Sequence, residues 1–499
     1  MTIVDTGQGA LEGGPWNGVV RFAGIPYAAP PVGPSRFRPP GPPVRWSGVR
    51  AATRHGPVSL QNEGPLQAAL GAGTPNQSED CLTLSVHTPA ADSGRRPVLV
   101  WIHGGGFLTG FGSSPLHDGS RLAARGDVVV VSVNYRLGVA GFLHLGELDP
   151  ALSSSGLNGI LDQIAALHWV RDNIAAFGGD PLNVTVFGAS AGAMSIGALL
   201  VMPAARGLFR RAILQSGAAE SAFDRDLGAA RARRFCQLAA CSTVADLEAL
   251  TPSQLLRAQA MLDAEVQNVH SDERGWGSEL SFAPVVDGEH LPALPIELAL
   301  GGSLAEVDLL LGTTEQEWRL FSARTPAPAS DAELVARLDA LVVEPVAVIA
   351  RYRTHLGRQA TTKDVFDAVL TDIHFRLPAR RLADAAVAAG RRVWMYRFGY
   401  PSPAMDGGLG SCHGLEVPFV FDNRDGPITM LVGESSPAEL AGAMQCSWVN
   451  FARSGDPNHE GIPRWEPMSA STSPFLRFDR VTTANVDQGT GPEPALRAD

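Results

Sequence analysis

The sequence predicts an α/β fold with a large, mostly parallel central sheet flanked by helices. One observation is a series of short apolar segments of strand length, at 98–102, 128–133, 184–187, 212–214, 307–311 and 393–398. Such continuous apolar runs are typical of strands that are buried on both faces. The other observation is that longer segments with helical periodicity separate them, as in 157–177. Alternating strands and helices favour a parallel sheet covered on both sides.

The remaining segments predict how the rest of a single domain, 1–499, is arranged. Short β-prone runs at 2–4 and 19–22 alternate with glycines and predict a small N-terminal sheet. Two stretches, at about 218–281 and 322–361, are rich in Ala, Leu and charge and lack long strand runs, so we expect helical insertions there, over a pocket. The last residues, about 487–499, carry Gly, Pro and charge without periodicity, which predicts a flexible tail.

Composition and charge exclude several classes of protein. Hydrophobic residues make up 45% of the 499 and charged residues 18%, which favours a large globular core over disorder. The formal net charge of −11 argues against nucleic acid or anionic lipid as a partner. No window approaches the ~20 apolar residues of a membrane-spanning helix, and the N-terminus does not resemble a signal peptide. We therefore expect a cytoplasmic protein with no membrane partner.

The cysteines point to neither a disulfide framework nor a metal site. They are odd in number, widely spread and without CxxC or Cys/His spacing: Cys81, Cys236, Cys241, Cys412 and Cys446. We expect them to be mostly free, buried thiols, and we expect no metal.

The sharpest chemical signal is a serine between two glycines. Ser190 is the centre of Gly-Ala-Ser-Ala-Gly at 188–192, after the apolar strand 183–187 and before the helix-prone run 193–200. A nucleophilic serine needs a sharp strand-to-helix turn that lifts its hydroxyl clear of the sheet, and the glycines let neighbouring backbone pass close by. In this context the motif predicts a nucleophile rather than a plain glycine-rich turn.

A second glycine-rich segment lies upstream, at the end of the strand 98–102. The run His-Gly-Gly-Gly at 103–106 offers bare main-chain amides, which stabilise the oxyanion of acyl transfer. A phosphate loop would need GxxxxGK[ST], which the sequence lacks. We expect the amides of Gly105, Gly106 and Ala191 to form an oxyanion hole.

The acid and base of a catalytic triad must lie downstream of Ser190. Hydrolases whose nucleophilic serine lies on such a strand-to-helix turn have the chain order serine, acid, histidine. Glu315 and Glu317 both follow the strand 307–311, and spacing alone does not choose between them. The histidines downstream of that acid are His355, His374, His413 and His459. His413 is favoured because it lies in a tight, glycine-flanked loop soon after the strand 393–398, with His459 as second choice.

Taken together, these segments resemble type B carboxylesterases, which have the α/β-hydrolase fold. This family contains para-nitrobenzyl esterases and cholinesterases. The resemblance spans nearly the whole chain and includes RFAGIPYAAPPVGPSRFRPP, SEDCLTL, WIHGGGF, VNYRLG, VTVFGASAG, ILQSG, GTTEQE, SCHGLEVPFVF and NFARSGDPN. It implies that Glu317 is the triad acid and His413 the base. It also implies a structural ion pair between Arg36 and Glu79.

The chain also departs from the family pattern. Ala189 stands where family members commonly carry a glutamate, which changes the charge of the pocket. Both family disulfides are expected to be absent, in keeping with a reducing compartment. The tryptophan that cholinesterases place before SEDCL is missing, so a choline ester is not expected.

These observations predict a serine carboxylesterase that hydrolyses a small-molecule ester through an acyl-enzyme on Ser190, without a cofactor. The helical insertions would lie over the active site, with Phe107, Leu108, Phe111 and Phe282 as candidate pocket walls. The same triad would serve an amidase, a carbamate hydrolase or a hydrolase of one bulky ester, and sequence does not separate these. A binding protein that keeps the fold without catalysis is the non-enzyme alternative, which the intact triad disfavours. Oligomeric state stays open.

Overall fold

The computed structural model describes residues 1–64, 75–272, 280–357, 359–487 and 494. Within them, thirteen strands form one sheet in the order β1-β2-β3-β5-β7-β6-β8-β9-β10-β11-β12-β13, with β4 paired to β2. The strands are β1 (Thr2–Thr6), β2 (Gly9–Trp16), β3 (Val19–Pro26), β4 (Val49–Ala51), β5 (Thr83–Thr88), β6 (Arg96–Ile102), β7 (Val129–Val133), β8 (Gly179–Ala189), β9 (Arg211–Gln215), β10 (Asp308–Thr314), β11 (Val393–Phe398), β12 (Ser473–Phe478) and β13 (Thr483–Asp487).

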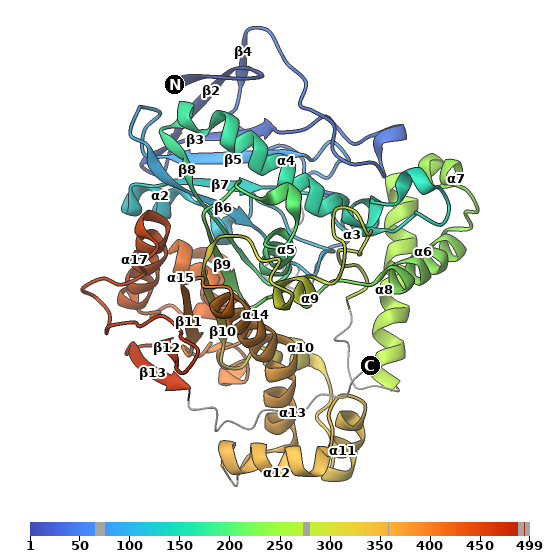
Figure 1. The fold of residues 1–499 in the computed structure, drawn as a ribbon, viewed down its shortest axis with the longest axis vertical. Helices are drawn as coiled ribbons and strands as arrows, with labels where there is room; N and C mark the ends of the chain where they lie inside the picture. Colours follow the sequence, from blue (N-terminus) through green and yellow to red (C-terminus); the bar gives the residue numbers. More distant parts are fainter. Residues whose placement is uncertain (65–74, 273–279, 358, 488–493, 495–499) are drawn as a thin grey trace.

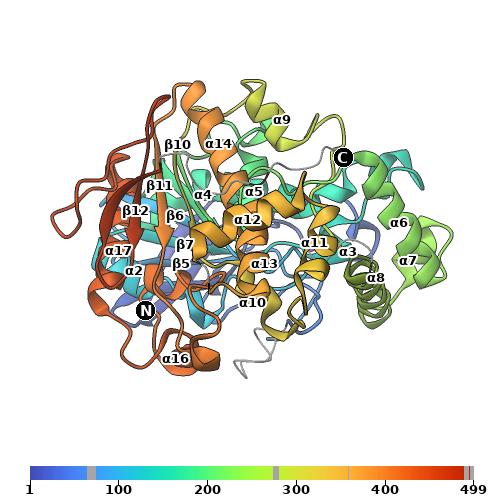
Figure 2. The ribbon, with the colours of Figure 1, turned by 90° about the horizontal axis from the view of Figure 1, so that it is seen from below.

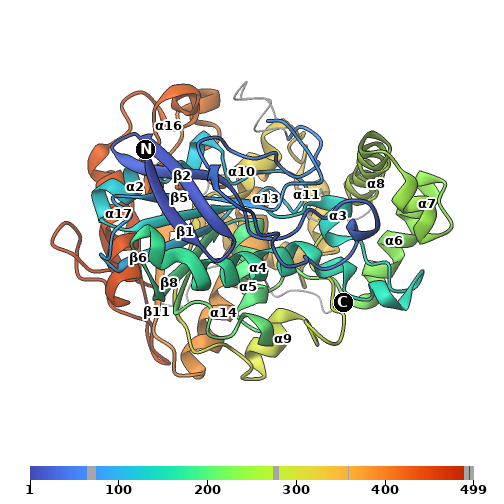
Figure 3. The same ribbon diagram turned by 90° about the horizontal axis from the view of Figure 1, so that it is seen from above.

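The centre of this sheet is parallel. Seven neighbouring strands, from β7 through β6 and β8 to β12, run in one direction, while β5 and β13 pair antiparallel at either side. The strands β1, β2 and β4 form the small N-terminal sheet, and β3 joins it to the central sheet by pairing with both β2 and β5. Figure 3 shows β1 and β2 on the outside of the molecule. The predicted parallel α/β architecture is therefore confirmed.

Helices cover both faces of the parallel strands. The longer ones are α2 (Ser120–Gly126), α4 (Asn158–Asn173), α5 (Ala191–Leu199), α6 (Arg225–Ala239), α8 (Pro252–Asp272), α11 (Asp331–Asp339), α12 (Pro345–Leu356), α13 (Thr362–Thr371), α14 (Leu377–Ala388) and α17 (Ala438–Ser454). The shorter ones are α3 (Gly138–Phe142), α7 (Val244–Ala249), α9 (Pro295–Leu300), α10 (Trp318–Phe321), α15 (Val417–Phe421) and α16 (Thr429–Val432).

Alternation along β6 shows how the two faces are filled. Val98, Val100 and Ile102 belong to the core that α4, α5 and α14 cover, whereas Leu99 and Trp101 belong to the core under α2, α15 and α17. Figure 1 shows α2 and α17 on the opposite side of the sheet from α4 and α5. Because successive strand residues point to opposite faces, a continuous apolar run is what a doubly covered strand requires.

Two groups of helices lie outside these layers. The helices α6, α7 and α8 fall within the stretch 218–281, of which 273–279 lie outside the described residues. The helices α11 and α12 fall within 322–361, and with α13 they enclose a small core of their own, around Leu334, Val348 and Val369. Figure 1 shows this second group at one end of the molecule, and Figure 2 shows the molecule from that end. The predicted tail lies almost entirely outside the described residues.

Two other expectations concern charged and thiol side chains. Arg36 Nε lies 2.5 Å from Glu79 Oε1 and Arg36 Nη2 lies 3.0 Å from Glu79 Oε2, so the predicted ion pair is present and bidentate. All five cysteines are free thiols, four of them buried.

Candidate active site

Ser190 occupies the turn between β8 and α5. Its φ of 55° and ψ of −126° lie outside the regions that non-glycine residues prefer, which costs of order 1–3 kcal/mol. Its main-chain N–H donates to the carbonyl of Gln215 over 2.9 Å, and its carbonyl accepts from Met194. A Cβ atom at Gly192 would lie 2.0 Å from the carbonyl oxygen of Ile102, so only glycine lets β6 pass this closely. The strained turn is therefore held from two neighbouring strands.

Glu317 and His413 lie together beyond the carboxyl ends of β10 and β11. His413 Nδ1 is 2.7 Å from Glu317 Oε2, and the Glu317 side chain is completely buried. The other oxygen, Oε1, accepts from the Ser216 hydroxyl over 2.6 Å and from the Thr314 amide over 2.7 Å. Three donors thus provide hydrogen-bond partners for both oxygens of this buried carboxylate.

The end of β9 links the serine to this pair. Gln215 accepts from the Ser190 amide, and the next residue, Ser216, donates to Glu317. Ser190, Glu317 and His413 follow the carboxyl ends of β8, β10 and β11, which are parallel and therefore end at the same edge of the sheet. In open α/β sheets this edge is where ligands bind.

The loops of the acid and the base are also joined to each other. The main-chain N–H of Gln316 donates to the Ser411 carbonyl over 3.0 Å, and the Ser411 N–H donates back to Gln316 Oε1 over 2.9 Å. A Cβ atom at Gly410 would lie 2.0 Å from that same side-chain oxygen and would displace it, and the φ of 53° also favours glycine there. The glycine that flanks the histidine loop thus makes room for a side chain of the acid loop.

The alternative acid and bases have other contacts. Glu315 forms a bidentate ion pair with Arg477, at 2.6 and 2.9 Å. His459 Nε2 lies 3.2 Å from the Ser447 hydroxyl and 3.0 Å from the Ala443 carbonyl. His374 is half-buried and stacks on Trp318, and His355 is exposed on α12. The geometry therefore favours Glu317 over Glu315 and His413 over the other three histidines.

The glycine loop after β6 lies against the nucleophile. A Cβ atom at Gly104 would lie 2.6 Å from the Ala189 carbonyl oxygen and 3.0 Å from Ser190 Cβ. Gly105 and Gly106 have φ values of 119° and 61°, which favour glycine. None of the amides of Gly105, Gly106 and Ala191 donates to an acceptor among the described residues. Their role in an oxyanion hole stays a prediction.

His103 supports this loop. Its ring stacks on Tyr135 with centroids 4.4 Å apart, and the Tyr135 hydroxyl donates to the His103 carbonyl. His103 Nδ1 lies 2.9 Å from the Gly104 carbonyl oxygen. Burial lowers the pKa of His103 to about 4, so the ring is neutral and its contacts are structural.

Two aromatic rings that sequence reasoning missed flank His413. The ring centroids of Phe321 and Phe375 lie 5.1 and 4.9 Å from that of His413. Phe321 is 47% exposed, so it offers an apolar surface to solvent beside the base. Phe375 belongs to a π-helical turn, Asp372–Arg376, between α13 and α14. Such turns are frequent at functional sites, but a pattern read from residues alone does not reveal them.

The four candidate pocket walls are largely covered by protein. Phe107 and Phe282 are buried in the main core, and Phe107 makes an edge-on contact with Phe142. Phe111 is also buried, and Leu108 is partly exposed. Their role as walls stays a prediction.

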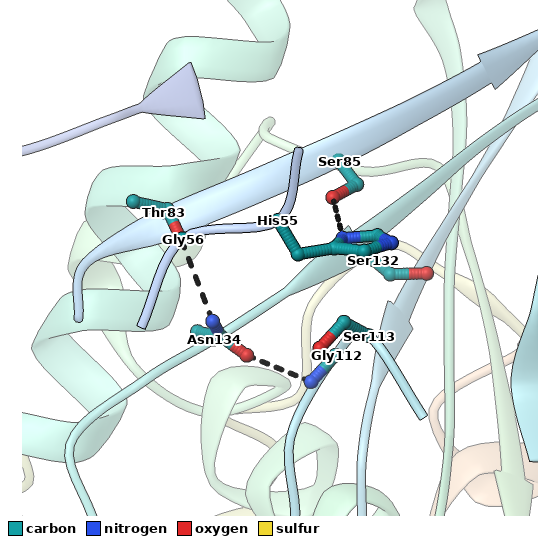
Figure 4. A pocket seen from close by; sticks show the side chains of 8 residues that line it. All are labelled: His55, Gly56, Thr83, Ser85, Gly112, Ser113, Ser132 and Asn134. Carbon is teal, nitrogen blue, oxygen red and sulfur yellow. Dashed lines mark hydrogen bonds between the residues drawn. The ribbon is translucent and has the colours of Figure 1, made fainter. Parts of the chain in front are cut away.

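A small polar cavity lies elsewhere, between β5, β7 and the loop after β6 (Figure 4). His55 Nδ1 lies 3.0 Å from the Ser85 hydroxyl, and Asn134 accepts from the Gly112 amide and donates to Thr83. Its volume of ≈ 10 Å³ has room for about one water molecule. It contains no residue of the predicted triad, so we assign it no catalytic role.

The described residues contain no group of three or more His, Cys, Asp and Glu side chains that could hold a metal ion. No helix among them is both long and apolar enough to cross a membrane.

The parallel sheet, the serine turn and the buried acid–histidine pair define a serine hydrolase of the α/β-hydrolase fold. More narrowly, the chain belongs to the carboxylesterase family, whose model matches residues 1–493. It is 40% identical over 492 residues to para-nitrobenzyl esterase of Bacillus subtilis, covering 97% of this chain and 96% of that protein. It is 36% identical over 487 residues to phenmedipham hydrolase of Pseudarthrobacter oxydans, covering 95% and 94%.

Solved structures agree with these relatives. The carboxylesterase EST55 of Geobacillus stearothermophilus, at pH 6.2, superposes with a TM-score of 0.87 at 40% identity and covers 98% of each chain. A structure titled thermophilic PNB esterase gives a TM-score of 0.86 at 39% identity, again over 98% of each chain. The chain is therefore a carboxylic ester hydrolase, as predicted.

Proposed function

We propose that this enzyme hydrolyses small, uncharged carboxylic esters with Ser190 as nucleophile, His413 as general base and Glu317 as the acid that orients it. The observation that carries the proposal is the 2.7 Å contact between His413 Nδ1 and the buried Glu317 carboxylate, at the sheet edge where the Ser190 turn also lies. Since Glu317 fixes the proton on Nδ1, Nε2 is left free to accept a proton from a hydroxyl.

The reaction then follows in two halves. His413 takes the proton of Ser190 as its Oγ attacks the ester carbonyl, and the amides of Gly105, Gly106 and Ala191 donate to the oxyanion. The alcohol leaves with the proton from His413, which forms an acyl-enzyme. A water molecule, deprotonated by the same imidazole, attacks the acyl group and releases the carboxylic acid.

The surroundings of the site support uncharged substrates. Ala189 places a methyl group, not a carboxylate, directly before the nucleophile, so a cationic substrate lacks a counter-charge at that position. Phe321 and Phe375 offer apolar ring surface beside His413. The relatives are named for a para-nitrobenzyl ester and for phenmedipham. We further propose a cytoplasmic location, which the five free thiols support.

The test combines turnover with active-site labelling. Wild type is expected to hydrolyse para-nitrophenyl acetate, butyrate and octanoate and to be labelled by a fluorophosphonate, whereas Ser190→Ala should do neither. Ser195→Ala is the matched control, because Ser195 lies further along the chain, in α5, and among the described residues its hydroxyl contacts Gln163 and the Ala191 carbonyl. Labelling that survives in Ser190→Ala would contradict the assignment of the nucleophile.

A further inference from the structure

A second buried carboxyl group lies close to the acid–histidine pair. Glu416 follows His413 by three residues, directly before α15, and is completely buried. Its Oε1 accepts from Gln215 Nε2 over 3.2 Å. Its Oε2 has no hydrogen-bond partner among the described residues. The mechanism above does not use this group.

The two carboxyl groups differ in how many donors they have. Glu317 has three donors in other residues, His413, Ser216 and the Thr314 amide, whereas Glu416 has one such donor among the described residues, the neutral side-chain amide of Gln215. An ionised carboxylate without compensating donors costs several kcal/mol when buried. Two carboxylates in one buried site also repel each other. The donors therefore favour the charge on Glu317 and a proton on Glu416.

Burial and the nearby charges act on Glu416 in the same direction. Desolvation, and next the charge of Glu317, raise the pKa of Glu416 to about 7, against weaker opposing contributions from its own backbone, His413 and Gln215. The other titratable groups near Glu416 are themselves buried and neutral, since burial raises the pKa of Cys412 to about 12 and that of Tyr396 well above its ordinary value.

Gln215 connects Glu416 to the nucleophile. Its side-chain Nε2 donates to Glu416, and its Oε1 accepts from the indole N–H of Trp448 over 3.1 Å. Its main-chain carbonyl accepts from the Ser190 amide over 2.9 Å. Both atoms of the Gln215 side-chain amide are therefore held, which restrains the strand end that supports the strained serine turn.

We propose that Glu416 is a positioning residue that, up to about neutral pH, works as a neutral carboxylic acid, holding Gln215 and the Ser190 turn while Glu317 remains the single negative charge beside His413. This inference rests on the proposed function. An ionised Glu416 would add a second negative charge near the imidazole. That charge would favour the imidazolium over the neutral imidazole that the mechanism needs as a base.

The experiment compares Glu416→Gln, which keeps size and neutrality, with Glu416→Ala, which removes the group. At a pH about one unit below the pKa of about 7, the infrared spectrum of wild type minus Glu416→Gln should contain the carbonyl band of one protonated carboxylic acid. That band should disappear as the pH rises through 7. Glu416→Gln should keep kcat within about twofold. It should also leave the acid limb of the pH profile of kcat/KM unchanged, because glutamine and the protonated glutamic acid are both neutral at that pH.

Glu416→Ala should lower kcat by up to about 10²-fold with little change in KM, because a small misplacement of the nucleophile is enough for such a loss. The proposal is overturned if the difference spectrum contains no acid band, if Glu416→Gln loses as much kcat as Glu416→Ala, or if its acid limb moves to lower pH. If Glu416→Ala does not fold, the kinetics of Glu416→Gln and the infrared difference spectrum still test the proposal. An inactive wild type would count against the esterase proposal alone, since the band reports protonation without turnover.

Discussion

His413 Nδ1 lies 2.7 Å from Glu317 Oε2, although 96 residues separate the two in sequence. The carboxylate is fully buried and the imidazole is largely buried, so solvent cannot replace either partner. This contact favours the tautomer of His413 in which Nδ1 carries the proton.

Glu317→Gln should lower kcat by about 10⁴-fold without unfolding the protein. The amide can still accept from Ser216 and the Thr314 N–H, but its NH₂ group then faces His413 Nδ1 and favours the wrong tautomer. Steady-state kinetics and circular dichroism measure the two effects. Glu315→Gln is the matched control, since that side chain pairs with Arg477 and should affect stability more than kcat. Equal losses of kcat in both variants would contradict the assignment.

Gly106→Ala should lower kcat/KM by about 10²-fold while the protein stays folded. The added methyl group has space, because the nearest atom is Leu280 Cδ2 at 3.8 Å. The φ of 61° is nonetheless strained for alanine, so the backbone is expected to rotate and turn an oxyanion-hole amide away. Gly207→Ala serves as control, since it has a φ of 75° and no atom within 4 Å of the added carbon. It should lose about 1 kcal/mol of stability and no activity.

Stability should fall as the pH is lowered from about 6.5 towards 4, partly because of His87. Burial lowers the pKa of His87 to about 4, from an unfolded value near 6.5. In this window the unfolded chain binds more protons than the folded one, so the free energy of unfolding decreases with decreasing pH. His87→Phe should flatten that slope in urea denaturation at a series of pH values. His355→Gln, at an exposed position, controls for loss of a histidine, and superimposable slopes in wild type and His87→Phe would refute the idea.

Asp162→Ala should cost about 3–5 kcal/mol, because it leaves the buried Arg136 guanidinium unpaired. Asp162 accepts from Arg136 Nη2 and Nε over 2.7 and 2.8 Å, and both side chains are at most 2% exposed. Asp172→Ala is the comparison, since its pair with Arg171 is about half exposed and should be worth at most about 1 kcal/mol. Chemical denaturation measures both, and similar losses would show that burial does not set the cost.

The sequence predicts those parts of the site whose chemistry depends on consecutive residues. The turn around Ser190 and the loop of Gly105 and Gly106 are visible because strand, glycines and helix follow one another along the chain. The choice of Glu317 over Glu315 is not local: it depends on Ser216 and Arg477, which approach from β9 and β12. The central sheet was predictable for the same reason as the turn, since doubly buried strands are continuous apolar runs.

What could not be predicted are the residues that act through distant contacts. Phe375 reaches His413 only because α13 and α14 meet at a π-helical turn, and Glu416 reaches Gln215 across 201 residues. No spacing rule connects such positions. The candidate walls Phe107 and Phe282 lie close to motifs or insertions in sequence, but both are part of the hydrophobic core. Closeness to a motif therefore does not show that an aromatic side chain lines the pocket.

The two hydrogen bonds between Gln316 and Ser411 have a consequence for motion. They join the segment that carries Glu317 to the segment that carries His413, so a displacement of one segment is passed on to the other. The Glu317 carboxylate also accepts from Thr314 and from Ser216, at the ends of β10 and β9, and the Ser190 amide donates to Gln215 at the end of β9. The acid, the base and the nucleophile are thus fastened to one edge of the sheet, and we expect displacements of the outer helices to leave the acid–imidazole contact intact.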